Sequence, residues 1–148
     1  MSEGHRWWRT VVFVASVMVA TRAGAEHVDS CIPGASTFAT SVTFSGPPGL
    51  TIAGLGIAVE YPRDEVAAPA FTAASGVANV TNDEGGRFIA EPIKIGGLPR
   101  PFMHATYKRC EGTRSPATSE FRCTVTDASD NNGNVVDSKS VSCAVTVP

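Results

Sequence analysis

Hydrophobic and polar residues alternate one by one along the C-terminal part of the chain. Phe121, Cys123 and Val125 alternate with polar residues, and residues 141–147 repeat the pattern. A period of two is typical of half-buried β-strands. The segment 130–134 between them contains an Asn-Gly step, which supplies the positive φ angles of a tight turn. The chain is therefore predicted to end with a strand, a turn and a strand.

Further strands are predicted upstream, separated by short segments rich in Gly, Pro, Asn and Asp. They cover residues 38–44, 50–61, 77–81, 87–95 and 102–109. Pro92 lacks the N–H donor of a sheet ladder, so its strand is expected at a sheet edge or with a bulge. The Ala-rich residues 65–76 favour an irregular crossover because Pro69 interrupts them. With no amphipathic helical period elsewhere, the sequence predicts an all-β fold, a two-sheet β-sandwich.

The N-terminus has the pattern of a secretory signal peptide. Basic residues precede the apolar run 11–20, and Ala23-Gly24-Ala25 matches a cleavage site of the A-x-A type. The apolar run is about half as long as a bilayer requires. Residues 1–25 are therefore predicted to be removed. This leaves one secreted, extracellular or periplasmic domain, residues 26–148, with no membrane segment.

Composition limits both the core and the partners. The 148 residues are 43% hydrophobic and 18% charged, enough apolar material for one core but not for two. The chain has 12 Lys and Arg against 14 Asp and Glu, and three of the arginines fall within residues 1–25. The mature domain is thus acidic and has no basic run. This disfavours nucleic acid and anionic membranes as partners.

Four cysteines remain after removal of the signal peptide. An even number in an exported chain predicts two disulfides, and a zinc site is disfavoured because no C-x-x-C pair exists. Cys110 ends one predicted strand and Cys123 lies in the next, so we expect a Cys110–Cys123 bridge, with Cys31 joined to Cys143. The alternative is a Cys123–Cys143 bridge, because both residues fall on inward positions of successive strands.

No catalytic constellation is evident. The mature histidines are His27 and His104, no G-x-S-x-G motif is present, and paired acids such as Asp83 and Glu84 lie in predicted turns. The sequence therefore indicates a protein that is not an enzyme.

One segment carries oxygen ligands at alternating positions and is a candidate for bound calcium. The glycine at the sixth loop position of an EF-hand would place Ala128 first, and no bidentate Glu follows. Turn formation is the favoured role, so no cofactor is expected, and calcium is the alternative. The residues concerned are Asp127, Asp130, Asn132, Asn134 and Asp137.

Three motifs together resemble a cohesin-type domain over about residues 37–147. They are the run Leu55-Gly-Ile-Ala-Val-Glu-Tyr-Pro62 followed by Val66, the Ala105-Thr-Tyr strand, and Asp127-Ala-Ser-Asp-Asn-Asn-Gly-Asn134 before a Val-rich last strand. The resemblance implies a jelly-roll sandwich, which is also similar to one family of carbohydrate-binding modules. It further implies docking of a secreted protein that carries a dockerin-like module.

The same resemblance implies that one sheet face takes the partner. The strands concerned match residues 55–61, 87–91 and 121–126, and their outward side chains combine a flat centre of small residues with charges at the rim. The alternative is that the small residues lie beneath a covering loop. The binding residues expected on this basis are Gly56, Ala58, Glu60, Arg87, Glu91, Arg122 and Thr124.

Polysaccharide binding is the alternative function. Sugar-binding sandwiches usually offer exposed Trp or Tyr platforms. Trp7 and Trp8 leave with the signal peptide, and most of the remaining aromatic residues occupy core-facing positions of predicted strands. A protein partner is therefore favoured over a polysaccharide.

Overall fold

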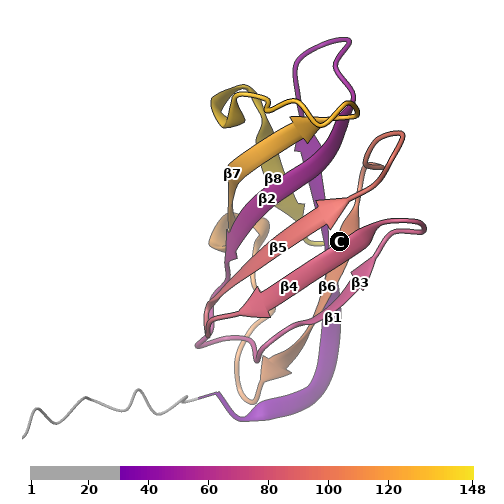
Figure 1. Cartoon of the computed structure of the whole chain (residues 1–148). Helices are drawn as coiled ribbons and strands as arrows, with labels where there is room; N and C mark the ends of the chain where they lie inside the picture. Colours follow the sequence, from indigo (N-terminus) through magenta and orange to yellow (C-terminus); the bar gives the residue numbers. More distant parts are fainter. Residues whose placement is uncertain (1–30) are drawn as a thin grey trace, which may run out of the picture.

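Two four-stranded antiparallel β-sheets form the body of the protein in the computed structural model, which describes residues 31–148 (Figure 1). The expected signal peptide, residues 1–25, lies outside the described residues. One sheet has the order β3-β6-β1-β8 and the other β4-β5-β2-β7. The strands are β1 (Pro33–Ser45), β2 (Ile52–Glu60), β3 (Ala70–Ala73), β4 (Ala78–Asp83), β5 (Arg87–Ile93), β6 (Met103–Cys110), β7 (Arg122–Asp130) and β8 (Ser142–Thr146).

The predicted two-sheet β-sandwich is confirmed, and each strand expected from the sequence is present. Two short 3₁₀-helices, η1 (Thr118–Glu120) and η2 (Ser138–Ser140), precede β7 and β8. Neither helix is long or apolar enough to cross a membrane, and residues 31–148 contain no other helix. The segment 65–76, expected to be an irregular crossover, contains strand β3. Its small residues acquire strand geometry by pairing with β6, where Phe71 lies opposite Ala105.

The core lies between the two sheets and follows the period-two pattern. Leu55, Ile57 and Val59 of β2 point inward and are at most 3% exposed. Tyr107 of β6 is fully buried and stacks on Phe38 with a centroid distance of 5.4 Å. Because inward positions alternate with outward ones along each strand, the core assignment also determines which side chains the outer faces present.

Pro92 lies in an interior strand, so the expectation of a sheet edge was wrong. Strand β5 has β4 on one side and β2 on the other, and its pairing with both keeps a constant register without a bulge. The β2–β5 pairs do stop between Gly54↔Ile93 and Ile57↔Ala90, across from the proline. The missing N–H is thus accommodated by a local gap in this ladder. The buried proline ring still contributes to the core.

The disulfides join Cys31 to Cys110 and Cys123 to Cys143. The expected Cys110–Cys123 and Cys31–Cys143 pairs were therefore wrong, and the alternative Cys123–Cys143 bridge is present. Strand order explains this result. β7 and β8 are edge strands of the two sheets and Cys123 bonds to Cys143 across them, whereas β6, which ends at Cys110, lies between β3 and β1. The segment before β1 runs beside the end of β6, which places Cys31 within 5.1 Å of Cys110 between Cα atoms.

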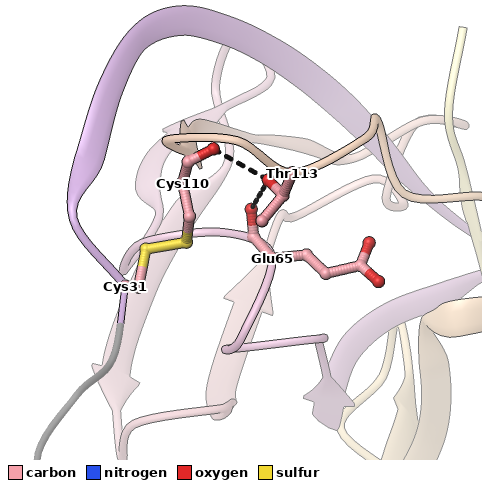
Figure 2. Close-up of a disulfide and its surroundings, with 4 residues drawn as sticks. All are labelled: Cys31, Glu65, Cys110 and Thr113. Atoms are coloured by element: carbon pink, nitrogen blue, oxygen red, sulfur yellow. Dashed lines mark hydrogen bonds between the residues drawn. A yellow bond between two sulfur atoms is a disulfide. The ribbon is translucent and has the colours of Figure 1, made fainter.

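A small hydrogen-bonded cluster surrounds the Cys31–Cys110 bridge (Figure 2). The hydroxyl oxygen of Thr113 lies 2.8 Å from the Cys110 carbonyl oxygen and 3.1 Å from that of Glu65. The amide of Cys110 also donates to the Glu65 carbonyl. These contacts connect the end of β6 to the turn after β2, so the bridge closes one end of the sandwich.

Candidate functional site

Strand register brings the expected binding residues onto one face, the outer face of the β4-β5-β2-β7 sheet. Ala58 of β2 pairs with Thr124 of β7, and Glu60 pairs with both Arg87 of β5 and Arg122 of β7. All five side chains point away from the core, because their neighbours along each strand point inward. They form two adjacent rows across the sheet.

Glu91 and Gly56 complete the set on the same face. Glu91 lies on β5 opposite Val80 of β4, and Gly56 lies opposite Asp127 of β7. No other described strand or loop runs in front of this face in Figure 1. We call the outward surface of strands β4, β5, β2 and β7 the outer face of the second sheet.

The centre of this face is lined by Gly54, Gly56 and Ala58, which are buried although no loop covers them. A Cβ atom placed on Gly56 would lie 2.6 Å from Oγ1 of Thr126 and 2.7 Å from Oδ2 of Asp127. These flanking side chains therefore shield the centre. Within residues 31–148, side chains of β7 therefore lie over the glycines of this centre, and no loop covers them.

A bulge in β7 explains this arrangement. The β2–β7 register shifts between Gly56↔Asp127 and Ile57↔Val125, so β7 has one extra residue, Thr126, at this point. Both Thr126 and Asp127 are exposed as a result. A bulge of this kind redirects side chains and accentuates the local twist of a strand.

Three aliphatic residues on the same face were not expected from the sequence. Val80 is 68% exposed, Ile93 is 56% exposed, and Ile89, four residues before Ile93 on β5, is half-buried. The signal was present in the period-two pattern, because burial of Phe88, Ala90 and Pro92 requires the alternate residues of β5 to point outward. We call Val80, Ile89 and Ile93 the aliphatic strip.

Charged residues divide this face into two ends. At one end, Arg122 lies 4.0 Å from Glu60 and Arg87 lies 3.3 Å from Glu84, both exposed ion pairs. At the other end lie Glu91 and Asp127. Within residues 31–148, neither carboxylate forms an ion pair or a hydrogen bond. The face is therefore charge-balanced at one end and acidic at the other.

The residues considered for calcium binding do not act as one group. Asp127 lies on the outer face of the second sheet, whereas Asp137 caps η2 by accepting from the amide of Lys139. Asp130 accepts from the amides of Asn132 and Asn134, at 2.8 and 2.9 Å, and from the Asn134 side chain. The Asn134 side chain and these amides lower the pKa of Asp130. The geometry supports turn formation, and calcium binding remains an untested alternative.

His104 lies on the outer face of the other sheet. Its Nδ1 is 3.1 Å from the hydroxyl oxygen of Ser41, and no carboxylate of residues 31–148 hydrogen-bonds to it. The described residues contain no group of three His, Cys, Asp or Glu side chains placed to hold a metal ion. His27 lies outside the described residues.

Comparison with solved structures identifies a similar fold. The sixth cohesin of scaffoldin B from Acetivibrio cellulolyticus, crystallised in complex with a double mutant of the Cel5 dockerin, matches with a TM-score of 0.51 and 16% sequence identity. The match covers 70% of this chain and 82% of the cohesin chain. No protein-family model and no curated protein matches the sequence. At this identity the likeness shows the fold alone, and that fold is the cohesin-type β-sandwich.

Proposed function

We propose that this protein is a secreted or surface-located binding module without enzymatic activity, and that it docks a dockerin-type protein module. The observation that carries the proposal is the convergence of all seven expected binding residues on one uncovered sheet face. The fold adds support, because it is shared with a cohesin that was crystallised in complex with a mutant dockerin.

The shape and composition of the face suit a protein partner. On its outward side, β2 carries no side chain larger than that of Ala58 between Gly54 and Val59, so no bulky side chain of this strand stands between a partner and the middle of the face. The aliphatic strip supplies apolar area next to this centre. Charged residues at the periphery, such as Arg122 and Glu60, favour correct encounter and selection of a partner.

Secretion is supported by the two disulfides and by the signal-peptide pattern of the sequence. Disulfides form and persist in oxidising compartments, including the bacterial periplasm and the cell exterior. Both bridges connect segments that the fold brings together.

Polysaccharide binding has no comparable support in the described residues. Phe44, Phe88 and Phe102 belong to the buried core, and Phe38 and Phe71 pack against it. The outward side chains of the second sheet are aliphatic, small, polar or charged. Among the described residues, this face therefore presents no exposed aromatic ring on which a sugar could stack.

The first prediction is that Ala58→Arg abolishes partner binding. Ala58 is only 6% exposed, yet its Cβ points outward between Ile89 and Thr124, so a longer side chain can extend into solvent. The arginine would stand in the centre of the docking face. Recombinant dockerin modules encoded by the same organism would be tested by isothermal titration calorimetry, with thermal unfolding measured in parallel.

The matched control is Ala39→Arg, the same substitution on the outer face of the opposite sheet. Ala39 is exposed and pairs with the exposed Thr106 of β6. This variant is expected to bind like the wild type. Wild-type affinity in Ala58→Arg would contradict the docking face, and so would unfolding of that variant, because the position would then belong to the core.

A further inference from the structure

A groove crosses the acidic end of the outer face of the second sheet. It has a volume of about 180 Å³ and is lined by Gly54 and Leu55 of β2, Glu91 and Ile93 of β5, and Asp127 and Ser129 of β7. The groove lies over β2 where Gly54 has no side chain, and residues of β5 and β7 form its walls on both sides. One carboxylate stands on each wall.

These two carboxylates differ from the other charged residues of the face. Glu60, Arg87 and Arg122 each have an oppositely charged partner within 4.0 Å. Glu91 and Asp127 have none among residues 31–148. A partner that covers the groove removes both carboxylates from water, and this costs free energy unless the partner supplies a compensating charge.

The aliphatic strip lies directly beside the groove. Ile93 lines it, and Val80 lies on β4 opposite Glu91. Isolated exposed aliphatic residues are common on proteins, but here Val80 and Ile93 flank a small-residue centre and an acidic pair on one sheet. The local chemistry is therefore an aliphatic surface next to two unpaired negative charges.

We infer that the partner inserts a lysine or arginine side chain into the groove between Glu91 and Asp127 and lays neighbouring aliphatic side chains on Val80 and Ile93. This inference rests on the proposed docking function and specifies the chemistry of its partner. Because the opposite end of the face is charge-balanced, the partner docks in one direction, with its basic side chain at the Gly54 end.

Charge complementarity favours this occupant over a second copy of the chain. The arginines of the face, Arg87 and Arg122, are already paired with Glu84 and Glu60. A second copy that docked through the same face would have to break those pairs in order to neutralise Glu91 and Asp127. A basic side chain of a different protein would bind the two carboxylates without breaking an ion pair of this face.

The test uses the double variant Glu91→Gln/Asp127→Asn, which keeps the size of both side chains and removes their charges. The probes are the recombinant dockerin modules encoded by the same organism. Association rate and Kd are measured at about 50 mM and about 500 mM salt, because exposed charge interactions weaken as the Debye length shortens. The control is Asp64→Asn/Glu111→Gln, which makes the same charge change at two exposed residues that do not line the groove.

We expect the double variant to bind about tenfold more weakly at low salt, to associate more slowly, and to lose most of its salt dependence. The control should bind like the wild type. Within the bound module, replacement of one lysine or arginine by glutamine should reproduce the loss, and should add nothing when combined with the double variant.

A second pair of variants tests the aliphatic strip. Ile93→Ser should weaken binding, whereas Ile32→Ser should not, because Ile32 is 64% exposed near Cys31, away from the outer face of the second sheet. Both side chains are exposed, so the fold should persist in each case.

The outcomes separate the inference from the proposed function. If Ala58→Arg abolishes binding but the double variant keeps wild-type affinity and salt dependence, the docking face stands and the basic-side-chain inference is wrong. If no dockerin module binds the wild type, the proposed function fails and the inference fails with it. Concentration-dependent self-association that the double variant abolishes would identify a second copy as the occupant and would overturn the inference.

Discussion

Single residues determine what the outer face of the second sheet can contact. Gly54 and Gly56 leave space that the side chains of Ser129, Thr126 and Asp127 enter from β7. A side chain larger than hydrogen at either glycine would displace them. The position of the Asp127 carboxylate therefore depends on a glycine in the neighbouring strand.

Asp130 illustrates a second residue-scale effect, the use of a carboxylate to hold a turn. Its hydrogen bonds from the Asn134 side chain and from backbone amides lower the pKa of Asp130 below its ordinary value of 3.8. Its contribution to stability is therefore complete above that ordinary value. It is lost as the pH falls through the lower pKa of the folded state.

We predict that Asp130→Ala lowers the Tm at pH 7, because three donors of the turn lose their acceptor. The Tm difference from the wild type should shrink as the pH falls below about 4, where protonation weakens the same bonds in the wild type. Thermal unfolding followed by circular dichroism across this range measures the effect.

Asp130→Asn is the control for Asp130→Ala, because an amide oxygen still accepts hydrogen bonds from the turn. It should retain more stability than the alanine variant at pH 7 and show less pH dependence than the wild type. A rise in Tm on adding calcium, seen in the wild type and absent from Asp130→Ala, would contradict the turn assignment and favour a bound cation.

At the scale of elements, the two disulfides act on different parts of the sandwich. Cys123–Cys143 joins β7 and β8, which are edge strands of opposite sheets, and so closes one side of the sandwich. Cys31–Cys110 ties the segment before β1 to the end of β6. The bridges close chain segments with separations of 20 and 79 residues.

We predict that trypsin digestion without reduction yields two linked peptide pairs. Cleavage after the available Lys and Arg residues places each cysteine on its own peptide, so the pairing can be read directly by mass spectrometry. Cys31 should be linked to the peptide that begins at Cys110. Cys123 should be linked to the peptide that begins at Ser140. A Cys110–Cys123 link would contradict the strand order.

Removal of one bridge should lower stability without changing the fold. In the chain-entropy description, Cys123→Ala/Cys143→Ala costs about 3 kcal/mol, and removal of the longer Cys31–Cys110 bridge costs about 4.5 kcal/mol. Urea denaturation under non-reducing conditions compares the two variants with the wild type. Equal stability of the variants and the wild type would show that the bridges do not constrain the unfolded chain.

At the scale of the whole molecule, the core decides which face of each strand is available for binding. Phe88 is fully buried and packs edge-on against Phe71 at a centroid distance of 4.7 Å. Its neighbour Ile89 points to the opposite side, into the aliphatic strip. A shift of β5 by one residue would exchange these roles.

We predict that Phe88→Ala lowers the free energy of unfolding by about 3 to 5 kcal/mol, the usual cost of removing a buried aromatic ring. Ile89→Ala, one residue away, should cost less than about 1.5 kcal/mol because its side chain is half-exposed. Chemical denaturation of both variants measures the difference. Equal costs would contradict the register of β5.

The sequence by itself determined the fold class and most strands, because alternation between polar and apolar residues is a local property. It also predicted that Gly56, Ala58 and Glu60 point outward, because they alternate with the inward side chains of the same strand. The same alternation applied to β5 would have revealed Ile89 and Ile93. Strand β3 was missed because its short, small-residue segment becomes a strand only by pairing with β6.

Only the tertiary structure decided which strands are neighbours. The order β4-β5-β2-β7 places Pro92 in an interior strand, separates Cys110 from Cys123, and gathers the charged residues of three strands on one face. It also sets Glu91 and Asp127 on opposite walls of one groove. The physical reason is that strand pairing joins residues far apart in the chain, and alternation within a strand carries no information about which other strand lies beside it.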